Sequence, residues 1–384
     1  MLTLLRFFPR RGIKLVKGEG QYVWDSEGRR YIDFHTGHGV AFLGHRNPYV
    51  TNEIIKQVNS LMTASPVFDT EVMDDAIESL SQIIPPYMEG VSFLNSGSEA
   101  VELAIKLAFK HTKRGKLVAF RSSFHGRTLG ALSLTWNPRY REPVKEILLD
   151  VVFGEFNHPS ALHKVINEDT AAIFIEPIQG EGGVHVADYE FMKELEKLAR
   201  SVNALLVVDE VQTGFGRTGK LWSHTEYGIS PDILLAGKSI GGGFPVSAVF
   251  VHRELCETLQ FGDHGSTFGG NPLTLAAVKG GVRALKEDNV VDKAANMGEE
   301  LLRRLTSIAE DSRIVKEVRG KGLMVGVSLR IRVSRIIKCL QSRGVLALAA
   351  GSTVLRLLPP YLISKEDVEE VVNSLEQCLR TYGG

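Results

Sequence analysis

The chain has 384 residues, of which 43% are apolar and 23% are charged, and its 45 Lys and Arg residues balance its 45 Asp and Glu residues. This composition is typical of a globular protein, and the length is sufficient for two or three domains. Because the formal net charge is zero and no block of like charges occurs, the composition argues against binding to nucleic acid or to an anionic membrane surface.

The cysteines and the N-terminus predict where the protein resides. Cys256, Cys339 and Cys378 match neither a disulfide framework nor a zinc-ligand spacing, so we expect a reducing, cytoplasmic location. Arg6 and Pro9 interrupt the apolar residues at the N-terminus, which argues against a signal peptide. No apolar run approaches the roughly 18 residues of a membrane-spanning helix. We therefore predict neither export nor membrane insertion.

The first two-thirds of the chain predict a hairpin followed by an α/β domain. Residues 20–34 predict the hairpin, because aromatic residues alternate on both sides of a polar turn. An amphipathic helix is expected between Asp188 and Asn203. Short, uniformly apolar runs predict buried strands at 91–94, 117–120, 171–175, 204–208, 233–236 and 248–251. Strands that alternate with helices indicate a mostly parallel sheet covered on both faces.

The last third of the chain predicts a smaller α+β domain. A helix over 272–286 and a polar segment over 287–289 precede it. Within it we expect strands near 322–329, 344–348 and 354–357, and helices near 334–342 and 365–379. The predicted division is an N-terminal segment (1–45) that joins the small domain, a large domain (46–288) and the small C-terminal domain (289–384).

The first segment that could carry chemistry is Asn95-Ser-Gly-Ser-Glu99, between a predicted strand and a predicted helix. Free backbone amides and the positive end of the helix dipole suit a phosphate at such a turn, and the hydroxyls of Ser96 and Ser98 add donors. The alternative is a capping box formed by Ser96 and Glu99. The sequence leaves both interpretations open.

The second segment places Asp209, Glu210 and Gln212 directly after a buried strand. Ligands of open α/β sheets bind outside the carboxyl ends of the strands. A carboxylate there can hold a cationic ring nitrogen, a metal or the partner of a general base. The alternative is a cap for the following loop.

The third segment places Lys238 at the end of the strand at 233–236, before the glycine run at 241–243. Desolvation lowers the pKa of a lysine and makes it an amine nucleophile for an aldehyde cofactor. The glycines would allow a ligand to approach the backbone closely. The alternative is an ordinary solvated lysine in a loop.

Other motifs point elsewhere. Residues 237–239 resemble the end of a nucleotide-binding P-loop, but Asp232 stands where its first glycine is required. Residues 214–219 match G-x-G-x-x-G and keep a nicotinamide-dependent oxidoreductase open, although no helical periodicity follows them. The three histidines within residues 35–45 lie in irregular, glycine-containing sequence, so we predict no metal site.

The three segments together meet the requirements for binding pyridoxal 5'-phosphate (PLP): a phosphate site, an acid for the ring nitrogen and an amine for the aldehyde. With residues 123–128, 175–181 and 265–272, they closely resemble the class-III, fold-type-I aminotransferases along nearly the whole chain. Within that class the chain looks most like the acetylornithine and LysW-γ-lysine aminotransferases of arginine and lysine biosynthesis. Residues 135–143 resemble the archaeal branch, whose substrates are carried on the small protein LysW.

The resemblance implies roles for individual residues. Lys238 would bind the cofactor's aldehyde and then, as a free amine, move the substrate proton, and Asp209 would keep the ring nitrogen protonated. Thr267 of the partner subunit would complete the phosphate site, which implies a homodimer. The other implied cofactor contacts are Ser96, Gly97, Ser98, Phe124, Glu210, Val211 and Gln212.

On the substrate side, the resemblance places Arg127 on the distal carboxylate and Ser266 close to the substrate. Glu181 and Arg356 resemble the family's gate, an ion pair that hides the arginine from one substrate and opens to bind the α-carboxylate of glutamate or 2-oxoglutarate. One segment departs from the pattern: residues 44–48 read Gly-His-Arg-Asn-Pro where many relatives have a second histidine, which puts a role in substrate choice in doubt.

The expected function is transfer of the terminal amino group between a carrier-blocked lysine or ornithine and 2-oxoglutarate. N-acetylornithine is the first alternative substrate, ornithine or 4-aminobutyrate the next, and the nicotinamide oxidoreductase is the alternative from another class. Arg139, Arg141 and Lys145 form a local basic cluster. It is either a docking surface for an acidic carrier or an ordinary solvated loop.

Overall fold

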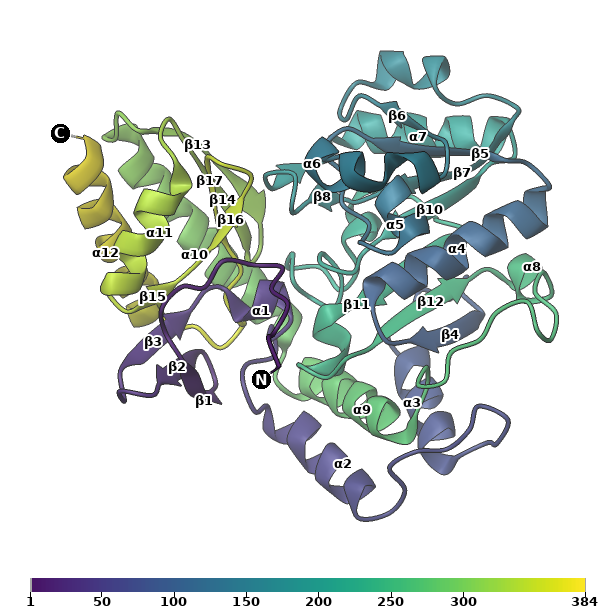
Figure 1. Ribbon diagram of the computed structural model, residues 1–384, viewed down its shortest axis with the longest axis horizontal. Helices are drawn as coiled ribbons and strands as arrows, with labels where there is room; N and C mark the ends of the chain where they lie inside the picture. Colours follow the sequence, from purple (N-terminus) through teal and green to yellow (C-terminus); the bar gives the residue numbers. More distant parts are fainter. Residues whose placement is uncertain (1, 384) are drawn as a thin grey trace.

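The computed structural model describes residues 2–383, and its largest sheet has seven strands in the order β4-β12-β11-β10-β7-β5-β6 (Figure 1). β12 runs antiparallel to both its neighbours, and the other neighbouring pairs are parallel. The strands are β4 (Gly90–Leu94), β12 (Ser247–Val251), β11 (Ile233–Gly237), β10 (Leu205–Asp209), β7 (Thr170–Ile175), β5 (Lys116–Phe120) and β6 (Val151–Gly154). The predicted α/β class with a mostly parallel sheet is therefore confirmed.

Six of these strands were predicted within a residue or two. Five of the six are buried along nearly their whole length, and the exception is β4 at one edge of the sheet. In β10, for example, Leu206 and Val208 join the core on one face, and Leu205 and Val207 join the core on the other. The sequence analysis missed β6, which lies at the sheet edge and is buried only in part. A short edge strand with half-exposed residues carries little local signal.

Helices cover both faces of the sheet. On one face α4 (Gly97–Thr112) packs its buried residues into one core cluster, and on the other face α7 (Tyr189–Ser201) and α9 (Pro272–Glu287) pack into a second, larger cluster. The predicted helices at 188–203 and 272–286 are therefore confirmed. Asp188 occupies the N-cap position of α7, although its side chain accepts no capping hydrogen bond.

The predicted N-terminal hairpin forms from β2 (Tyr22–Asp25) and β3 (Arg30–Asp33). An additional strand, β1 (Leu15–Glu19), pairs with β2, and β3 pairs in parallel with β15 (Val345–Leu346). This pairing joins the beginning of the chain to its last third, as Figure 1 also shows. It supports the division into domains predicted above, which remains our proposal.

The last third forms a four-stranded antiparallel sheet in the order β13-β14-β17-β16 with helices packed against it. Its strands are β13 (Val315–Lys321), β14 (Met324–Leu329), β17 (Val354–Leu357) and β16 (Leu348–Ala350), and its helices are α10 (Val290–Glu310), α11 (Val333–Ser342) and α12 (Lys365–Gly383). The single strand predicted over 344–348 is instead divided between β15 and β16, which belong to different sheets. The prediction also missed α10 and β13.

Shorter elements complete the fold. They are α1 (Thr36–Gly39), α2 (Pro48–Val58), α3 (Glu71–Ser81), α5 (Leu129–Ser133), α6 (Pro138–Arg141), α8 (Arg253–Cys256), β8 (Ile178–Gln179) and β9 (His185–Val186). Short 3-10 helices occupy 142–147, 159–164, 223–227 and 238–241. Within residues 2–383, no helix combines the length and apolar composition required to cross a membrane.

One expectation about the cysteines was wrong: Cys339 and Cys378 form a disulfide. Their positions differ by 39 residues, but α11 and α12 pack against each other and bring them together. Linear spacing cannot reveal such a contact. Disulfides also occur inside cells in hyperthermophiles, so this bond is compatible with either kind of compartment, and the cytoplasmic location remains a prediction.

Loss of this disulfide is expected to destabilise the small domain. Cross-linking a loop of this length stabilises a protein by about 3–4 kcal/mol, because it lowers the conformational entropy of the unfolded chain. We expect Cys339→Ser to lower Tm by several degrees in thermal melts, and a reducing agent to lower Tm of the wild type to the same value. Cys256→Ser is the control, because Cys256 is an exposed free thiol. A reducing agent that leaves Tm of the wild type unchanged would contradict the assignment.

Candidate active site

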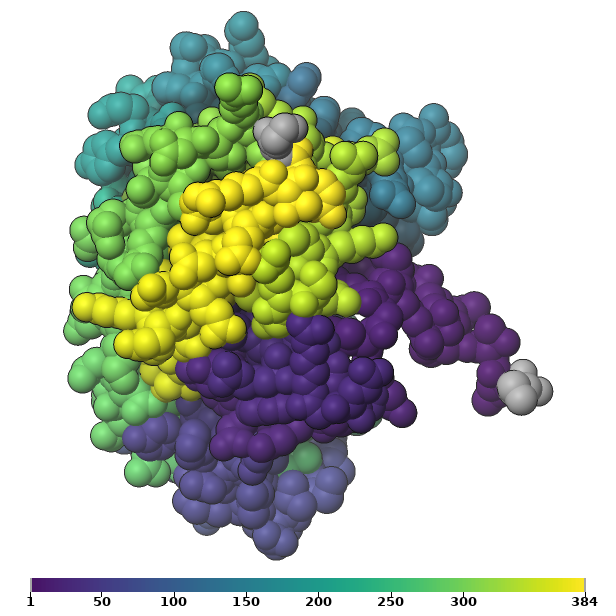
Figure 2. Space-filling view, turned by 90° about the vertical axis from the view of Figure 1, so that its left-hand side faces the viewer, coloured from purple at the N-terminus to yellow at the C-terminus, as the bar shows by residue number. Residues whose placement is uncertain are grey.

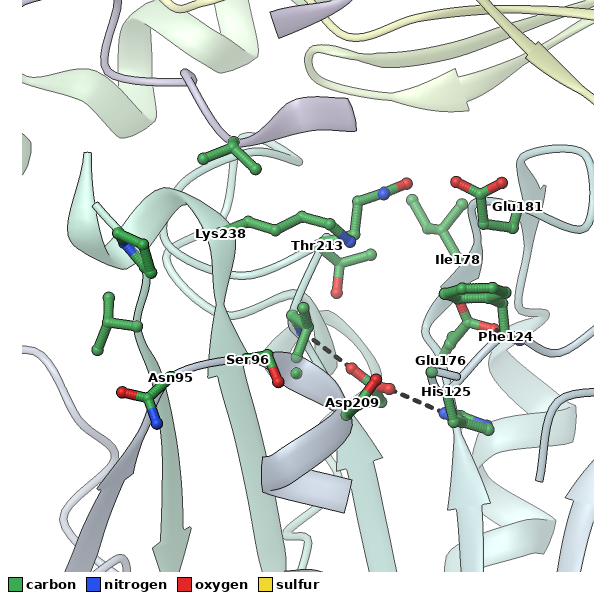
Figure 3. A pocket seen from close by; sticks show the side chains of 18 of the residues that line it. Asn95, Ser96, Phe124, His125, Glu176, Ile178, Glu181, Asp209, Thr213 and Lys238 are labelled. Carbon is green, nitrogen blue, oxygen red and sulfur yellow. Dashed lines mark hydrogen bonds and ion pairs between the residues drawn. The ribbon is translucent and has the colours of Figure 1, made fainter. Parts of the chain in front are cut away.

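A cavity of about 370 Å³ lies at the carboxyl ends of β5, β7, β10 and β11, where open α/β sheets bind their ligands. All three segments identified in the sequence reach it. Gly97 and Ser98 line one end, Asp209 lies at the base, and Lys238 extends across it. Figure 3 shows Lys238 and Phe124 projecting into the same space from opposite sides, with Asp209 between them.

The turn before α4 forms the predicted cap and also lines the cavity. The Ser96 hydroxyl accepts a hydrogen bond from the Glu99 amide at 3.3 Å, so the cap forms. Gly97 and Ser98 remain on the cavity wall at the N-terminus of a 16-residue helix. A Cβ on Gly97 would lie 3.0 Å from the side chain of Val211, so glycine permits this close approach. Free amides and the helix dipole therefore face the cavity.

Asp209 is buried and is held by two hydrogen bonds. One carboxylate oxygen lies 2.8 Å from Nδ1 of His125, and the other accepts the Val211 amide at 3.0 Å (Figure 3). Burial lowers the pKa of His125, but the hydrogen bond to Asp209 and the negative charges of Asp209 and Glu176 together outweigh burial, so the pKa is raised. The two contacts fix the position of the Asp209 carboxylate. The bond from Val211 is the local cap, and Asp209 also lines the cavity.

Lys238 has the properties expected of an amine nucleophile. Its backbone has a φ of 44°, in the left-handed region that non-glycine residues adopt infrequently. Desolvation lowers the pKa of its amine, against the opposing effect of the carboxylates of Glu181 and Asp209. Within the described part of the chain, no hydrogen bond or ion pair engages its Nζ atom. It is not an ordinary solvated lysine.

Glu181 and Arg356 form the ion pair that the sequence predicted. Arg356 is fully buried on β17, and its Nη2 lies 2.5 Å from Oε1 of Glu181. Its Nη1 donates to Oε1 of Gln212 at 3.2 Å. Burial alone would raise the pKa of Glu181, but the guanidinium of Arg356 outweighs burial and lowers it. The pair lies directly beside the cavity, which Glu181 and Gln212 line.

Arg127 lies at the edge of the cavity rather than inside it. Its guanidinium lies 3.3 Å from the ring centroid of Tyr140 and 5.6 Å from that of Phe124. Its backbone amide donates to the hydroxyl of Ser98 at 3.1 Å. This position is compatible with the predicted contact to a substrate carboxylate, which remains a prediction.

Besides Arg127 and Arg356, three further predicted site residues do not line the cavity. Ser266 accepts a hydrogen bond from the side chain of Asn95 at 3.1 Å, just outside it, and Thr267 is exposed on the surface of its own chain. The carboxylate of Glu210 accepts three hydrogen bonds from Ser223 and His224 at 2.7–2.8 Å and faces away. Neighbouring residues at a strand end point to opposite sides, so Asp209 and Glu210 cannot both face the ligand. The side chain of Glu210 therefore does not reach the cavity, and its predicted role in cofactor binding remains a prediction.

The loop at 44–48 has a structural role. Nε2 of His45 lies 2.8 Å from Oδ2 of the buried Asp33, and Asn47 caps α2 by accepting the Tyr49 amide at 3.1 Å. Asparagine in place of a second histidine therefore suits the start of a helix. This loop contributes no residue to the cavity lining.

The oxidoreductase alternative fails on geometry. Residues 214–219 form turns, and the next regular element is a 3-10 helix at 223–227. A dinucleotide fingerprint must open an α-helix whose N-terminus binds the pyrophosphate. No such helix begins at this loop, so the match to G-x-G-x-x-G is coincidental.

The sequence analysis missed two buried residues of the site, His125 and Glu176. His125 directly follows Phe124, and Glu176 lies within the segment 175–181, so both fall in motifs that the analysis had identified. Oε1 of Glu176 accepts the Phe124 amide at 2.8 Å and thereby fixes the backbone that carries the aromatic ring. Their position in the sequence could have identified them, because both residues follow the carboxyl ends of predicted buried strands.

Glu176 makes stability depend on pH. Burial raises its pKa from 4.5 to about 7, so the folded protein binds this proton more tightly than the unfolded chain does. The free energy of unfolding is therefore expected to fall by up to about 3 kcal/mol as pH rises from about 4.5 to above 7. Glu176→Gln cannot ionise and should lack this fall. Denaturant unfolding of both proteins across this pH range measures the difference, and parallel curves would contradict it.

These residues fit PLP. The helix N-terminus suits its phosphate, the Asp209 carboxylate suits a protonated ring nitrogen, and the amine of Lys238 is free for its aldehyde. Phe124 offers an aromatic face on the cavity wall, and the volume lies within the range of small-molecule sites.

Comparison with known proteins agrees with this geometry. The Aminotransferase class-III model matches residues 9–379. The chain is 51% identical over 373 residues to the LysW-aminoadipate semialdehyde/glutamate semialdehyde transaminase of Sulfurisphaera tokodaii (97% of this chain, 96% of the relative). It is 49% identical over 378 residues to the protein of the same name from Sulfolobus acidocaldarius (98% and 97%).

Solved structures give the same result. The fold superposes with a TM-score of 0.93 and 30% identity on the ornithine aminotransferase of Toxoplasma gondii, whose active site holds PLP at partial occupancy, covering 98% of this chain and 91% of that one. The family model spans Lys238, Asp209 and the turn at Gly97 and Ser98, and the solved structure covers nearly the whole chain. The chain belongs to the class-III aminotransferases, which are PLP-dependent enzymes.

Proposed function

We propose that this aminotransferase moves the terminal amino group between a LysW-linked lysine or ornithine and 2-oxoglutarate, in lysine and arginine biosynthesis. The names of the two relatives support the substrate class, because semialdehydes of aminoadipate and glutamate gain a terminal amine on transamination. The observation that carries the proposal is a groove of about 910 Å³ that shares Phe124 and Glu181 with the cavity and opens beyond them. A substrate attached to a protein needs such an approach.

When bound, PLP supplies an aldehyde and a ring that withdraws electrons from the substrate carbon. The amine of Lys238 would hold the aldehyde and would move the proton of the substrate carbon within the cavity that Lys238 lines. Asp209, held by His125, would be the acid for the ring nitrogen. Phe124, whose backbone amide donates to Glu176, would offer an aromatic face to the ring.

The Glu181–Arg356 pair allows one cavity to handle two different substrates. While the pair is closed, Nη2 of Arg356 is held by Glu181 and Nη1 by Gln212, which suits a substrate that presents only a terminal amine. When Glu181 turns away, the guanidinium provides a two-point site for the α-carboxylate of glutamate. Gln212 keeps one hydrogen bond to Arg356 in either case and holds its orientation.

Glu181→Gln is expected to weaken this discrimination. Loss of the charge leaves Arg356 without an anionic partner, so KM for glutamate should fall. The discrimination of the enzyme against free α-amino acids should also fall, by about ten-fold. Single-turnover spectra with glutamate and with the terminal-amine substrate measure both half-reactions. Glu155→Gln, in an exposed ion pair with Arg121, is the control. Equal changes in both half-reactions would show that the pair is structural.

The structure narrows the surface that the carrier could use. Arg141 lies 4.7 Å from the ring of Phe153, and Lys145 pairs with Glu142 at 3.6 Å, so two members of the basic cluster are engaged locally. Arg139 lines the groove, together with Arg11 from the N-terminal segment, whose Nη1 donates to the Ala347 carbonyl at 2.7 Å. We place an acidic carrier over these two arginines.

A homodimer with shared sites is part of the proposal. Exposed apolar side chains on the N-terminal segment, which projects from the body of the molecule in Figure 2, and on the segment around Thr267 support it. They are Leu2, Leu4, Leu5, Phe7, Phe8, Phe261 and Phe268. Large apolar side chains of this density are typical of surfaces that a partner covers. Thr267 would then reach the phosphate site of the other subunit.

Activity measurements with two substrates test the proposal. The purified enzyme, loaded with PLP and supplied with 2-oxoglutarate, is assayed with LysW-linked lysine and with N-acetylornithine. We expect a higher kcat/KM for the carrier-linked substrate. An equal or higher kcat/KM for N-acetylornithine would assign the enzyme to arginine biosynthesis with a small substrate instead.

A further inference from the structure

Arg217, in the loop at 214–219, is a buried cation that the mechanism above does not use. Its side chain is inaccessible to solvent, and among the described residues no carboxylate lies within ion-pair distance of it. Its guanidinium donates instead to the backbone carbonyls of Pro359 at 2.5 Å, Gly39 at 3.0 Å and Leu323 at 3.1 Å. It also lies 4.2 Å from the ring of Phe42. A buried charge that relies on carbonyls alone is costly, so its position calls for an explanation.

The three carbonyls belong to three separate parts of the fold. Gly39 ends α1, Leu323 lies between β13 and β14, and Pro359 follows β17. The backbone of Arg217 also accepts the Leu323 amide at 2.9 Å, so contact is made in both directions. One side chain therefore joins the loop that follows β10 to the N-terminal segment and to the small domain.

Glycine makes these approaches possible at two points. Gly322 has a φ of 51°, and a Cβ there would lie 2.7 Å from the carbonyl oxygen of Arg217. Gly39 has a φ of 88°, and its Cβ would lie 3.2 Å from the side chain of Leu358. The backbones are thus packed directly on the loop.

The segments that Arg217 holds carry the gate. Pro359 closely follows Arg356 on the same strand end, and Gln212, which bonds Arg356, begins the loop that carries Arg217. Gly39 adjoins His38, which lines the groove together with Glu181. Small shifts at any of these segments would change the position of Arg356 relative to its two partners.

We propose that Arg217 is a positioning residue for substrate discrimination: its guanidinium holds the end of β17 and the end of α1 against the loop after β10, and so sets the alignment of Arg356 with Glu181 and Gln212. The inference rests on the proposed gate, but not on the identity of the carrier. Burial lowers the pKa of Arg217 to about 9, so the side chain stays charged at neutral pH. A lysine cannot replace it, because a compact ammonium cannot serve three carbonyls placed around a planar fork.

The test is Arg217→Lys in the PLP-loaded enzyme, with single-turnover rates measured for glutamate and for whichever terminal-amine substrate the wild type accepts. We expect the reaction with glutamate to slow by about ten- to a hundred-fold through a higher apparent Kd, because misplacement by an ångström has effects of this size. The reaction with the terminal amine should change by no more than a few-fold, and the visible absorbance of bound PLP should be retained. Gly39→Ala acts on one acceptor only, should shift the same ratio less, and covers the case in which Arg217→Lys fails to fold.

Trp222→Phe is the matched control. Trp222 is buried near the same loop and donates to the Ile83 carbonyl at 2.7 Å, away from the gate. It should lower Tm without changing the ratio of the two half-reactions. If Arg217→Lys and Gly39→Ala also lower only Tm, or slow both half-reactions equally, the positioning role is refuted while the proposed function stands. A wild type that does not discriminate between the two substrates would instead refute the gate itself.

Discussion

Lys238→Ala is expected to abolish transamination while the protein remains folded. The substitution removes both the amine that binds the cofactor aldehyde and the base that moves the substrate proton, and general acid–base catalysis alone contributes roughly 10²–10⁴-fold. The residue follows β11, and within the described chain its side chain makes no hydrogen bond or ion pair whose loss would destabilise the fold. Because the buried amine is desolvated, Tm of the apoenzyme should not fall.

The measurement compares kcat, Tm and visible absorbance of the variant with those of the wild type. Lys220→Ala, which removes an exposed lysine from the preceding loop, is the control and should keep full activity. A small primary amine added to Lys238→Ala should restore part of the proton transfer, because it can enter the space that the side chain leaves. Activity above a few per cent of the wild type without added amine would overturn the assignment of Lys238.

The strands of the large sheet could be predicted because their signal is local. A parallel strand covered on both faces is a short apolar run, and runs such as 205–208 and 233–236 have no other explanation in a chain of this composition. The same reasoning placed Lys238 and Asp209 at one edge of the sheet, because both follow such runs. The site was therefore predictable wherever its residues adjoin a buried strand.

Contacts between distant segments could not be predicted in this way. The disulfide between Cys339 and Cys378 depends on how two helices pack, and neither cysteine has a distinctive neighbour in the sequence. The contacts of Arg217 depend on backbone carbonyls, which every residue possesses. The resemblance to a family identified Glu181 and Arg356 as partners, whereas their spacing alone contains no such information.

Side-chain direction explains the remaining errors. Glu210 seemed equivalent to Asp209 in the sequence, yet it faces the opposite side of the strand end and holds the segment at 223–224. His125 was passed over because a histidine within a motif has no evident role until its partner is known. Thr267 is predicted to reach the phosphate site of a second subunit, and this role remains a prediction.

Asp209→Asn is expected to lower kcat by roughly 10²–10³-fold, the usual effect of removing one fixed group that stabilises charge in a transition state. Asparagine has nearly the same shape and can still accept the Val211 amide, so the loop should keep its conformation. PLP should still bind, because the turn at Gly97 and Ser98 is unchanged. What is lost is the negative charge opposite the ring nitrogen, and with it the elevated pKa of His125.

Glu210→Gln separates this effect from a loss of stability. Glu210 is the adjacent carboxylate and is also buried, but it accepts hydrogen bonds from Ser223 and His224, outside the cavity, and from the hydroxyl of Thr213 at 3.2 Å on the cavity wall. Removing its charge should lower Tm, since four donors lose an anionic acceptor, and should leave kcat per folded enzyme close to that of the wild type. NMR titration of the histidines should show a lower pKa for His125 in Asp209→Asn and not in Glu210→Gln. If Asp209→Asn keeps its kcat and loses only stability, Asp209 is a cap for the loop and the acid for the ring nitrogen must lie elsewhere.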